Sequence, residues 1–153
     1  MISKINVVEI LKRLEKETEH SKSFATTNLV FFKPYKKKFL GTFDESSFQI
    51  TKQNSSMADR VPFYINGIMR AQNGNKTEIE YELLPIWLDY FGKRIFIVFL
   101  FALNFAIAKN SNKLFDYLIL NIILLIVTFG VFWLEKKLKG KLENDFRELL
   151  EIE

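Results

Sequence analysis

Residues 95–108 read IFIVFLFALNFAIA and residues 114–134 read LFDYLILNIILLIVTFGVFWL, with five polar residues between the two runs. Asp116 is the only charged residue within either run. Hydrocarbon offers no water to backbone N–H and C=O groups, so a segment that crosses a membrane must be helical or part of a closed barrel. Apolar runs without polar alternation are not typical of barrel strands. The sequence therefore predicts a transmembrane helical hairpin with spans at about residues 93–110 and 114–134.

The two runs differ in length. A bilayer core about 30 Å thick requires roughly 20 helical residues, and the second run meets this requirement with 21 residues. The first run has 14 residues and must borrow length from its flanks, where Lys93, Arg94 and Lys109 would reach toward the headgroups. The alternative for the first run is a buried helix of a soluble core, but the closeness of the second run favours insertion of both as a pair.

Basic residues near the ends of the runs predict the orientation. Lys93 and Arg94 precede the first run, and four lysines between residues 136 and 141 follow the second. The connecting loop carries only two lysines, so both termini are expected to face the cytoplasm. Residues 1–14 mix charged with apolar residues and so have no uninterrupted signal-peptide core.

Composition limits the remaining possibilities. With 153 residues, the chain has room for one small soluble domain beside the hairpin. The formal net charge of +4 is modest and is concentrated beside the spans, so we expect no nucleic-acid partner. The absence of cysteine excludes disulfides, thiolate metal sites and cysteine nucleophiles.

Residues 4–19 are predicted to form an amphipathic helix with Ser3 as its N-cap. Four apolar residues recur there at steps of three and four and would share one face, namely Val7, Ile10, Leu11 and Leu14. The period then changes to two. Strands are predicted at residues 28–33, 38–43, 47–52, 61–71 and 77–84.

The last of these strands has the clearest pattern. Ile79, Tyr81 and Leu83 alternate with three glutamates, which is typical of an antiparallel strand with one wet face. The Asn-Gly pair that precedes it is a strong hairpin signal, and Gly67 on the partner strand indicates a bulge or a close packing point. We therefore expect an α+β fold, in which a four- or five-stranded antiparallel meander is covered by the amino-terminal helix.

After residue 134 the sequence predicts a further amphipathic helix. Its narrow apolar stripe could pack on the chain's own sheet, pair with another subunit or protein partner, or lie on the lipid surface. The expected domains are a cytoplasmic α+β domain at 1–88, the hairpin at 89–134 and this helix at 135–153. The stripe consists of Leu138, Leu142, Phe146 and Leu149.

Polar residues within or beside the spans are the first candidate site. Asn104, Asn121 and Thr128 are predicted to make polar contacts between the helices, and Asn104 and Asn121 lie at similar depths. The alternative is that they line a polar pore. The second candidate is contact with lipid headgroups through Lys36, Lys37, Lys38, Lys93 and Arg94. A solvated turn between strands explains the first three lysines equally well.

No pattern of catalytic residues is present in the sequence. His20 is the only histidine and has no cluster of possible metal ligands around it, so a position at a helix end explains it best. No glycine-rich phosphate loop or nucleophile-elbow motif occurs. We expect no enzymatic activity, no cofactor and no bound metal.

Several short segments resemble a pattern found in small bacterial membrane proteins without an assigned function. The resemblance is carried by FLGTF at 39–43, FQI at 48–50, Gly67-Ile68, IEY at 79–81, and the prolines at 62 and 85. It implies a bacterial source and a sheet domain beside the membrane. It implies no activity and no catalytic residues.

The leading functional hypothesis is a non-enzymatic inner-membrane protein. Its cytoplasmic domain would support self-assembly into a homo-oligomer or the docking of a protein partner, with membrane lipid as the other contact. One alternative is a membrane-active effector or oligomeric channel formed by the hairpins. Another is a membrane-tethered sensor of a small ligand.

Overall fold

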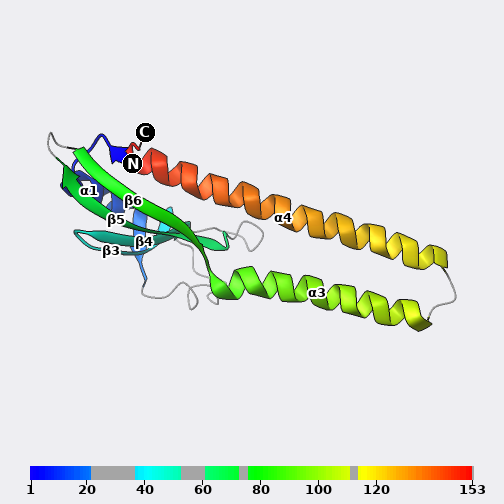
Figure 1. Ribbon diagram of the computed structural model, residues 1–153. Helices are drawn as coiled ribbons and strands as arrows, with labels where there is room; N and C mark the ends of the chain where they lie inside the picture. Colours follow the sequence, from blue (N-terminus) through cyan, green and yellow to red (C-terminus); the bar gives the residue numbers. More distant parts are fainter. Residues whose placement is uncertain (22–36, 53–60, 73–75, 111–113, 153) are drawn as a thin grey trace.

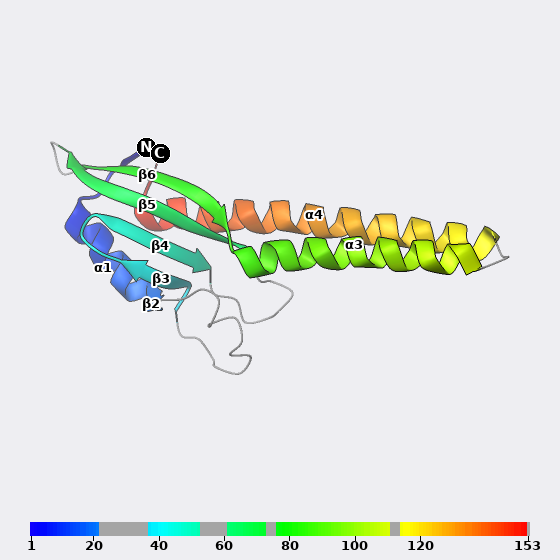
Figure 2. The same ribbon diagram turned by 60° about the horizontal axis from the view of Figure 1, so that its bottom comes forward.

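The computed structural model describes the chain apart from residues 22–36, 53–60, 73–75, 111–113 and 153. A sheet domain lies at one end of the molecule, and two long helices project from it side by side (Figures 1 and 2). The three described helices are α1 (Val7–Glu17), α3 (Trp87–Asn110) and α4 (Leu114–Leu150). The strands are β1 (Ile2–Ser3), β2 (Thr18–His20), β3 (Phe39–Phe43), β4 (Ser47–Lys52), β5 (Phe63–Gln72) and β6 (Lys76–Pro85).

The six strands form one mixed sheet of order β1-β6-β5-β4-β3-β2. Strands β3 to β6 pair antiparallel with their neighbours along the chain, which confirms the central part of the expected meander. The expectation of four or five purely antiparallel strands is wrong at both edges, because β2 pairs parallel with β3 and β1 pairs with β6. The predicted strand at residues 28–33 lies outside the described residues.

Helix α1 is shorter than the predicted helix at both ends. Asn6, and not Ser3, is its N-cap, because the Asn6 Oδ1 accepts a hydrogen bond of 2.8 Å from the Glu9 N–H. Ser3 lies in β1, and the residues after Glu17 leave the helix to form β2. The predicted apolar face is correct, since Ile10 and Leu14 are fully buried.

One core joins the sheet to α1 and to the last turns of α4. The buried side chains of β6 have the predicted phase, with Ile79 inside and Glu80 exposed. Helix α4 runs without interruption from the apolar run into the predicted amphipathic helix, so residues 135–150 belong to the sheet domain. The core is made of Ile10, Leu14, Phe39, Phe48, Ile50, Val61, Ile65, Met69, Ile79, Leu138, Leu142, Phe146 and Leu150.

The expected transmembrane hairpin is wrong, because only one helix in the described part of the chain is long and apolar enough to cross a membrane. That helix is α4, in which residues Leu118–Leu150 meet the requirement. Helix α3 lies beside it, but the 14 apolar residues between Arg94 and Lys109 span about 21 Å at 1.5 Å per residue. This is short of the hydrocarbon thickness of about 30 Å, and the residues directly beside the run, Lys93, Arg94 and Lys109, are charged.

Gly67 is a close packing point and not a bulge, because the pairing of β4, β5 and β6 continues through it without a shift. A Cβ on this residue would lie 2.4 Å from the ring of Phe48 and 2.8 Å from the carbonyl oxygen of Glu80. At Gly140 on α4, the same position has no described atom within 4 Å apart from the neighbouring backbone of its own helix.

Replacing Gly67 by alanine is therefore expected to lower the free energy of unfolding by about 1–3 kcal/mol, because the β4–β5–β6 contact must open. Gly140→Ala is the matched control and should raise it by about 0.5–1 kcal/mol, since alanine favours the helix. Thermal unfolding in mild detergent measures both. Equal midpoints for the two variants would contradict the packing described for Gly67.

Asp44 closes the turn between β3 and β4. Its carboxylate accepts hydrogen bonds from the backbone N–H groups and the hydroxyls of Ser46 and Ser47 at 2.7–3.0 Å. The Ser46 N–H is the largest cause that lowers the pKa of Asp44 from 3.8 to about 2, and the three other bonds add to it.

Because this pKa is lower in the folded than in the unfolded chain, the stabilisation is complete above about pH 4 and is lost as the pH falls toward 2. The wild-type chain should thus melt at a higher temperature than Asp44→Asn at pH 7, and the difference should shrink between pH 4 and pH 2. Glu45→Gln, at the neighbouring exposed position, is the control. A difference that does not change with pH would rule out the charged form as its source.

Candidate functional site

The apolar surface of α3 and α4 is the most unusual feature of the molecule. In the most apolar window of α4, with a mean hydropathy of 2.3, only 11% of the residues are buried. Soluble monomers rarely expose a contiguous apolar patch larger than a few hundred Å². The exposed side chains include Ile95, Phe96, Val98, Phe99 and Phe105 on α3 and Ile122, Ile123, Leu125, Ile126 and Phe129 on α4.

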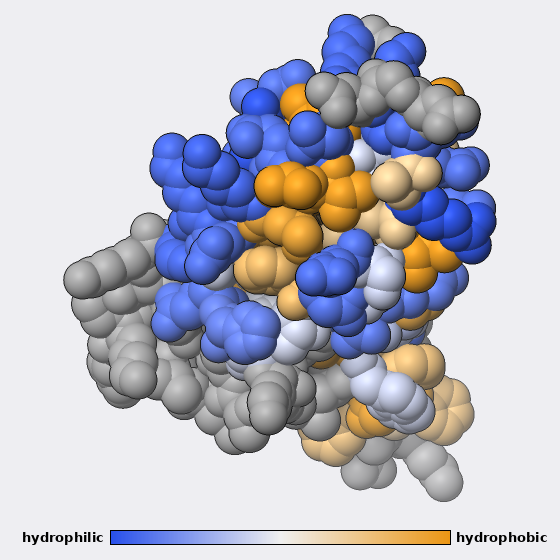
Figure 3. Space-filling model, turned by 90° about the vertical axis from the view of Figure 1, so that its left-hand side faces the viewer, coloured by the Kyte–Doolittle hydropathy of each residue, from blue (hydrophilic) through white to orange (hydrophobic). Residues whose placement is uncertain are grey.

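The end of the sheet domain that lies away from the helix tips has a different surface. Figure 3 shows it as mainly hydrophilic around a limited apolar patch. Exposed apolar side chains in this domain include Met1, Ile2 and Val8. The molecule thus combines a water-compatible domain with a pair of helices whose outer surface suits a hydrocarbon environment.

A collar of aromatic and basic side chains marks the boundary between these two parts. On α3, the guanidinium of Arg94 lies 3.4 Å from the ring centre of Tyr90. Arg94 also lies 5.4 Å from the ring of Phe132 on α4, and Lys137 lies 5.3 Å from Trp133. Aromatic rings with basic neighbours are enriched where membrane proteins meet the headgroup region.

Arg94 and Glu135 connect the two helices at the level of this collar. The Arg94 Nη2 lies 3.5 Å from Oε2 of Glu135, and Nη1 donates to the carbonyl oxygen of Tyr90 at 3.1 Å. Glu135 is 5% exposed, and its Oε1 has no hydrogen-bond partner among the described residues. Arg94 was predicted to contact lipid headgroups together with Lys93. The structure places its guanidinium against Glu135, while Lys93 is partly exposed.

Asn104 and Asn121 form the polar contact that the sequence predicts. The Asn104 side-chain amide donates a hydrogen bond of 2.9 Å to Oδ1 of Asn121, across the interface of α3 and α4. Asn104 is buried, and its own Oδ1 has no partner in the described part of the chain. Thr128 differs from the prediction, because its hydroxyl donates to the Leu124 carbonyl oxygen of the same helix.

The predicted basic cluster serves the sheet domain. Lys36 lies outside the described residues. Lys37 donates to the carbonyl oxygens of Glu15 and Thr18, at 2.6 and 3.2 Å, and so satisfies groups left free at the end of α1. Lys38 lies 3.1 Å from Asp145 of α4, which Lys52 also contacts. Both described lysines therefore bind elements of the chain itself.

The predicted oligomer or partner stripe lies largely inside the core. Leu138, Leu142 and Phe146 are buried against the sheet, and Leu149 is partly buried beside them. The ring of Phe146 lies 5.3 Å from Phe48 and 5.0 Å from Tyr81. The sequence left three alternatives open for this helix. In the structure it packs on the sheet of its own chain.

A polar cluster that the sequence did not suggest lies next to this stripe. The Tyr81 hydroxyl donates to Oε1 of Glu143 at 3.1 Å and accepts from Nε of Arg147 at 2.9 Å. Arg147 closes the triangle with a contact of 2.8 Å to Glu143. Burial raises the pKa of Tyr81. The spacing of Glu143 and Arg147 by one helical turn was visible in the sequence, but their partner on β6 was not.

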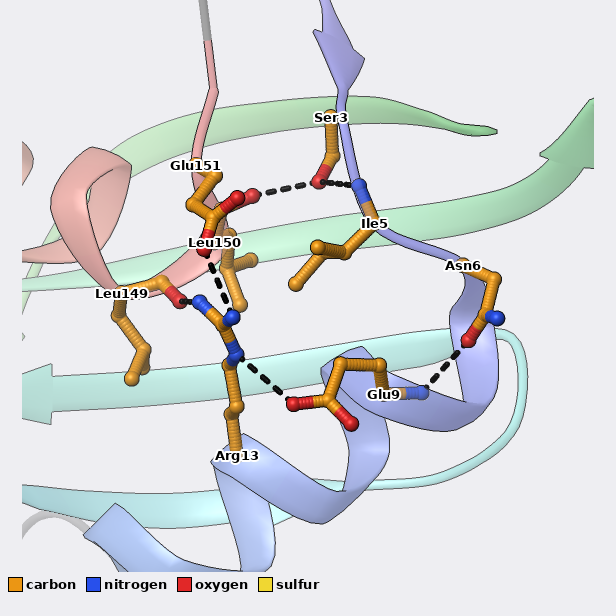
Figure 4. A network of polar contacts seen from close by, with 8 residues as sticks. All are labelled: Ser3, Ile5, Asn6, Glu9, Arg13, Leu149, Leu150 and Glu151. Atoms are coloured by element: carbon orange, nitrogen blue, oxygen red, sulfur yellow. Dashed lines mark hydrogen bonds and ion pairs between the residues drawn. The ribbon is translucent and has the colours of Figure 1, made fainter. Parts of the chain in front are cut away.

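A second unpredicted network holds the two ends of the described chain together (Figure 4). Arg13 of α1 binds the Glu9 carboxylate at 3.2 Å, the Leu149 carbonyl oxygen at 3.1 Å and the Glu151 carboxylate at 2.7 Å. The Ser3 hydroxyl donates to the Leu150 carbonyl oxygen. In the sequence, Arg13 has the pattern of an ordinary exposed helix residue. Its contacts with the distant residues Leu149 and Glu151 could therefore not be predicted from its neighbours.

The structure brings together no group of three or more possible metal ligands among its described residues. His20 lies in β2, with its ring 5.8 Å from Phe43 in an edge-on contact. The features that could serve a function are therefore the exposed apolar helices, the collar at their base and the surfaces of the sheet domain.

The contact of Arg94 with Glu135 can be tested by a double-mutant cycle. Arg94→Met leaves the Glu135 carboxylate buried without its cation, and we expect a loss of stability of about 1–3 kcal/mol. The double variant Arg94→Met with Glu135→Leu should regain most of that loss, because no buried charge remains. Thermal midpoints in mild detergent measure the cycle, and additive effects of the two substitutions would show that the pair does not interact.

Comparison with protein-family models, curated proteins and solved structures gives no match for this chain. The function must therefore be inferred from the geometry of the chain itself. It joins one helix with the length and apolar character of a membrane span to a sheet domain with a mainly hydrophilic end.

Proposed function

We propose that this protein is a non-enzymatic membrane protein of the bacterial inner membrane, in which the sheet domain binds a protein partner at the cytoplasmic surface. The apolar segment of α4 lies in lipid, and α3 packs beside it through the hydrogen bond between Asn104 and Asn121. Self-assembly or docking of a second protein would then take place through the part of the molecule that remains in water.

The observation that carries this proposal is the exposure of α4. A soluble protein can contain a helix of similar composition, but it buries such a helix in its core. Here the apolar window is almost fully uncovered in the single chain. Residues 114–134 form about 32 Å of helix at 1.5 Å per residue, which matches the hydrocarbon thickness of a bilayer.

The distribution of charge supports the orientation. The four lysines at positions 136–141 follow the apolar segment on the side where the sheet domain lies. Both ends of the described chain also lie on that domain, side by side (Figure 1). By the positive-inside rule, this side faces the cytoplasm.

The alternative of a channel lined by asparagines has less support from the geometry. Asn104 and Asn121 bind each other within one chain, and a contact of this kind holds two helices together without any pore. The docking hypothesis uses surfaces that remain open in the single chain and is therefore preferred.

The experiment exploits the absence of cysteine in the natural sequence. Single cysteines are placed at Phe129, within the apolar segment, and at Glu148, which is exposed on the last turns of the same helix. A third variant, Val8→Cys, is the control for an apolar residue that is exposed on the sheet domain. A membrane-impermeant maleimide is applied to spheroplasts and to inverted inner-membrane vesicles.

We expect Glu148→Cys and Val8→Cys to react in inverted vesicles but not in spheroplasts. Phe129→Cys should react in neither preparation until the membrane is dissolved in a denaturing detergent, because lipid excludes the charged reagent. Reaction of Phe129→Cys at the rate of Val8→Cys in intact vesicles would refute the membrane location. Reaction of Glu148→Cys in spheroplasts would refute the orientation.

A further inference from the structure

Along its second half, strand β6 has an edge that no described strand covers; this edge is called the free edge below. Strand β1 pairs with Thr77 and Glu78, and the backbone of Met1 bonds both the N–H and the C=O of Ile79 at 2.8 and 3.0 Å. Beyond Ile79, no strand of the described chain lies beside β6 on this side.

The alternation of backbone direction along β6 determines which N–H and C=O groups this edge exposes. Ile79 directs its N–H and C=O away from β5, and backbone groups alternate in direction along an antiparallel strand. The corresponding groups of Tyr81 and Leu83 therefore point outward as well. The backbone of Pro85 also points outward, but proline has no N–H. Leu83 is therefore the last residue of this edge that can donate a backbone hydrogen bond.

A groove of about 420 Å³ runs along this edge, between β6 and α4. Its lining includes residues 79–83 of β6, Met1, and Lys139 and Glu143 of α4. Tyr81 is fixed there by its bonds to Glu143 and Arg147. The side chains of a strand added to this edge would alternate between this groove and the opposite face of the sheet.

The opposite face is acidic. Glu78, Glu80 and Glu82 alternate with the residues that face the groove, and Glu80 and Glu82 are exposed. On β5, Arg70 lies 3.4 Å from Glu80, and the amide of Asn66 donates to Glu82 at 3.3 Å. Arg70 is the only basic residue of β5, and Lys76 at the start of β6 has the same phase as the glutamates, so two cations face three carboxylates. Both cations lie toward Glu78 and Glu80, and Glu82 has no cation beside it among the described residues of β5 and β6.

We propose that the free edge of β6 from Glu80 to Leu83 binds an extended segment of a partner protein, in which basic side chains alternate with apolar ones. The segment continues the sheet by hydrogen bonds to Tyr81 and Leu83. Its apolar side chains enter the groove, and its basic side chains lie opposite Glu80 and Glu82.

The charges also argue against a second copy of this chain as the occupant. If two β6 strands paired edge to edge across a twofold axis, glutamates of one copy would lie near those of the other, and like charges opposite each other are destabilising. This inference rests on the proposed function, since it names the surface and the partner chemistry of the docking domain.

The test uses the full chain in nanodiscs of zwitterionic phosphatidylcholine, with empty nanodiscs as the blank. The probe is a fluorescent ten-residue peptide of alternating lysine and valine, and a glutamate–valine peptide of the same length is the control ligand. We expect the lysine–valine peptide to bind at least about tenfold more tightly, as measured by fluorescence anisotropy.

Two variants probe the two parts of the contact. Glu80→Gln with Glu82→Gln should weaken binding of the lysine–valine peptide up to about fivefold for each carboxylate, whereas Glu45→Gln with Glu148→Gln, the matched change at exposed sites elsewhere, should not alter it. Leu83→Pro removes one outward N–H, which an edge strand tolerates, and should also weaken binding. The thermal midpoint of Leu83→Pro shows whether this variant is folded. If it is not folded, the variant with both glutamates replaced still tests the proposal.

Equal affinity for the two peptides would overturn the proposal, as would unchanged affinity in the variant with both glutamates replaced. Self-association of the chain through β6 in place of peptide binding would overturn it as well. The cysteine reactions distinguish the two levels. If the peptide fails while Phe129→Cys remains protected, the edge proposal is wrong and the membrane location stands.

Discussion

The continuity of α4 is the constraint on which the rest of the structure depends. This helix runs through 37 residues without a break, so its first part and its last part cannot move independently. The first part leaves most of its described apolar side chains exposed, and the last part presents a stripe to the sheet. A single helix therefore fixes the position of the sheet domain relative to the exposed apolar surface.

The core of the sheet domain depends on this arrangement. The domain has a single layer of strands, and a sheet needs a cover for its apolar face. Helix α1 supplies Ile10 and Leu14, while α4 supplies Leu138, Leu142, Phe146 and Leu150. The larger share of the cover thus comes from the same helix that carries the apolar segment. At the base of that segment, the contact between Arg94 and Glu135 adds a second link, from α3 to α4.

Local patterns in the sequence predicted much of this fold. The period-two pattern at residues 77–84 gave the correct inward face of β6, and residues 47–52 gave the bounds of β4. The pairing of Asn104 with Asn121 followed from their similar depths.

The edge strands could not be predicted, because two or three residues are too few to show a period and their partners are distant in sequence. Two membrane spans were predicted because both runs are strongly apolar. The apolar run of α3, however, has only 14 residues and is shorter than the hydrocarbon layer. The free edge of β6 and its groove had no signal in the sequence, since they arise from how distant elements of the chain pack against the sheet.

The network that joins the two ends of the chain also determines the order in which the protein can form. Ser3 and Leu150 are 147 positions apart and share a hydrogen bond, and Arg13 needs the carbonyl oxygen of Leu149. Synthesis proceeds from the amino terminus at about 5–20 residues per second, so the apolar segments leave the ribosome before the residues that close the core. The described amino-terminal strands therefore lack part of their cover until the last turns of α4 have been synthesised. Under the proposed membrane location, the apolar segment of α4 enters lipid before the domain acquires its finished surface.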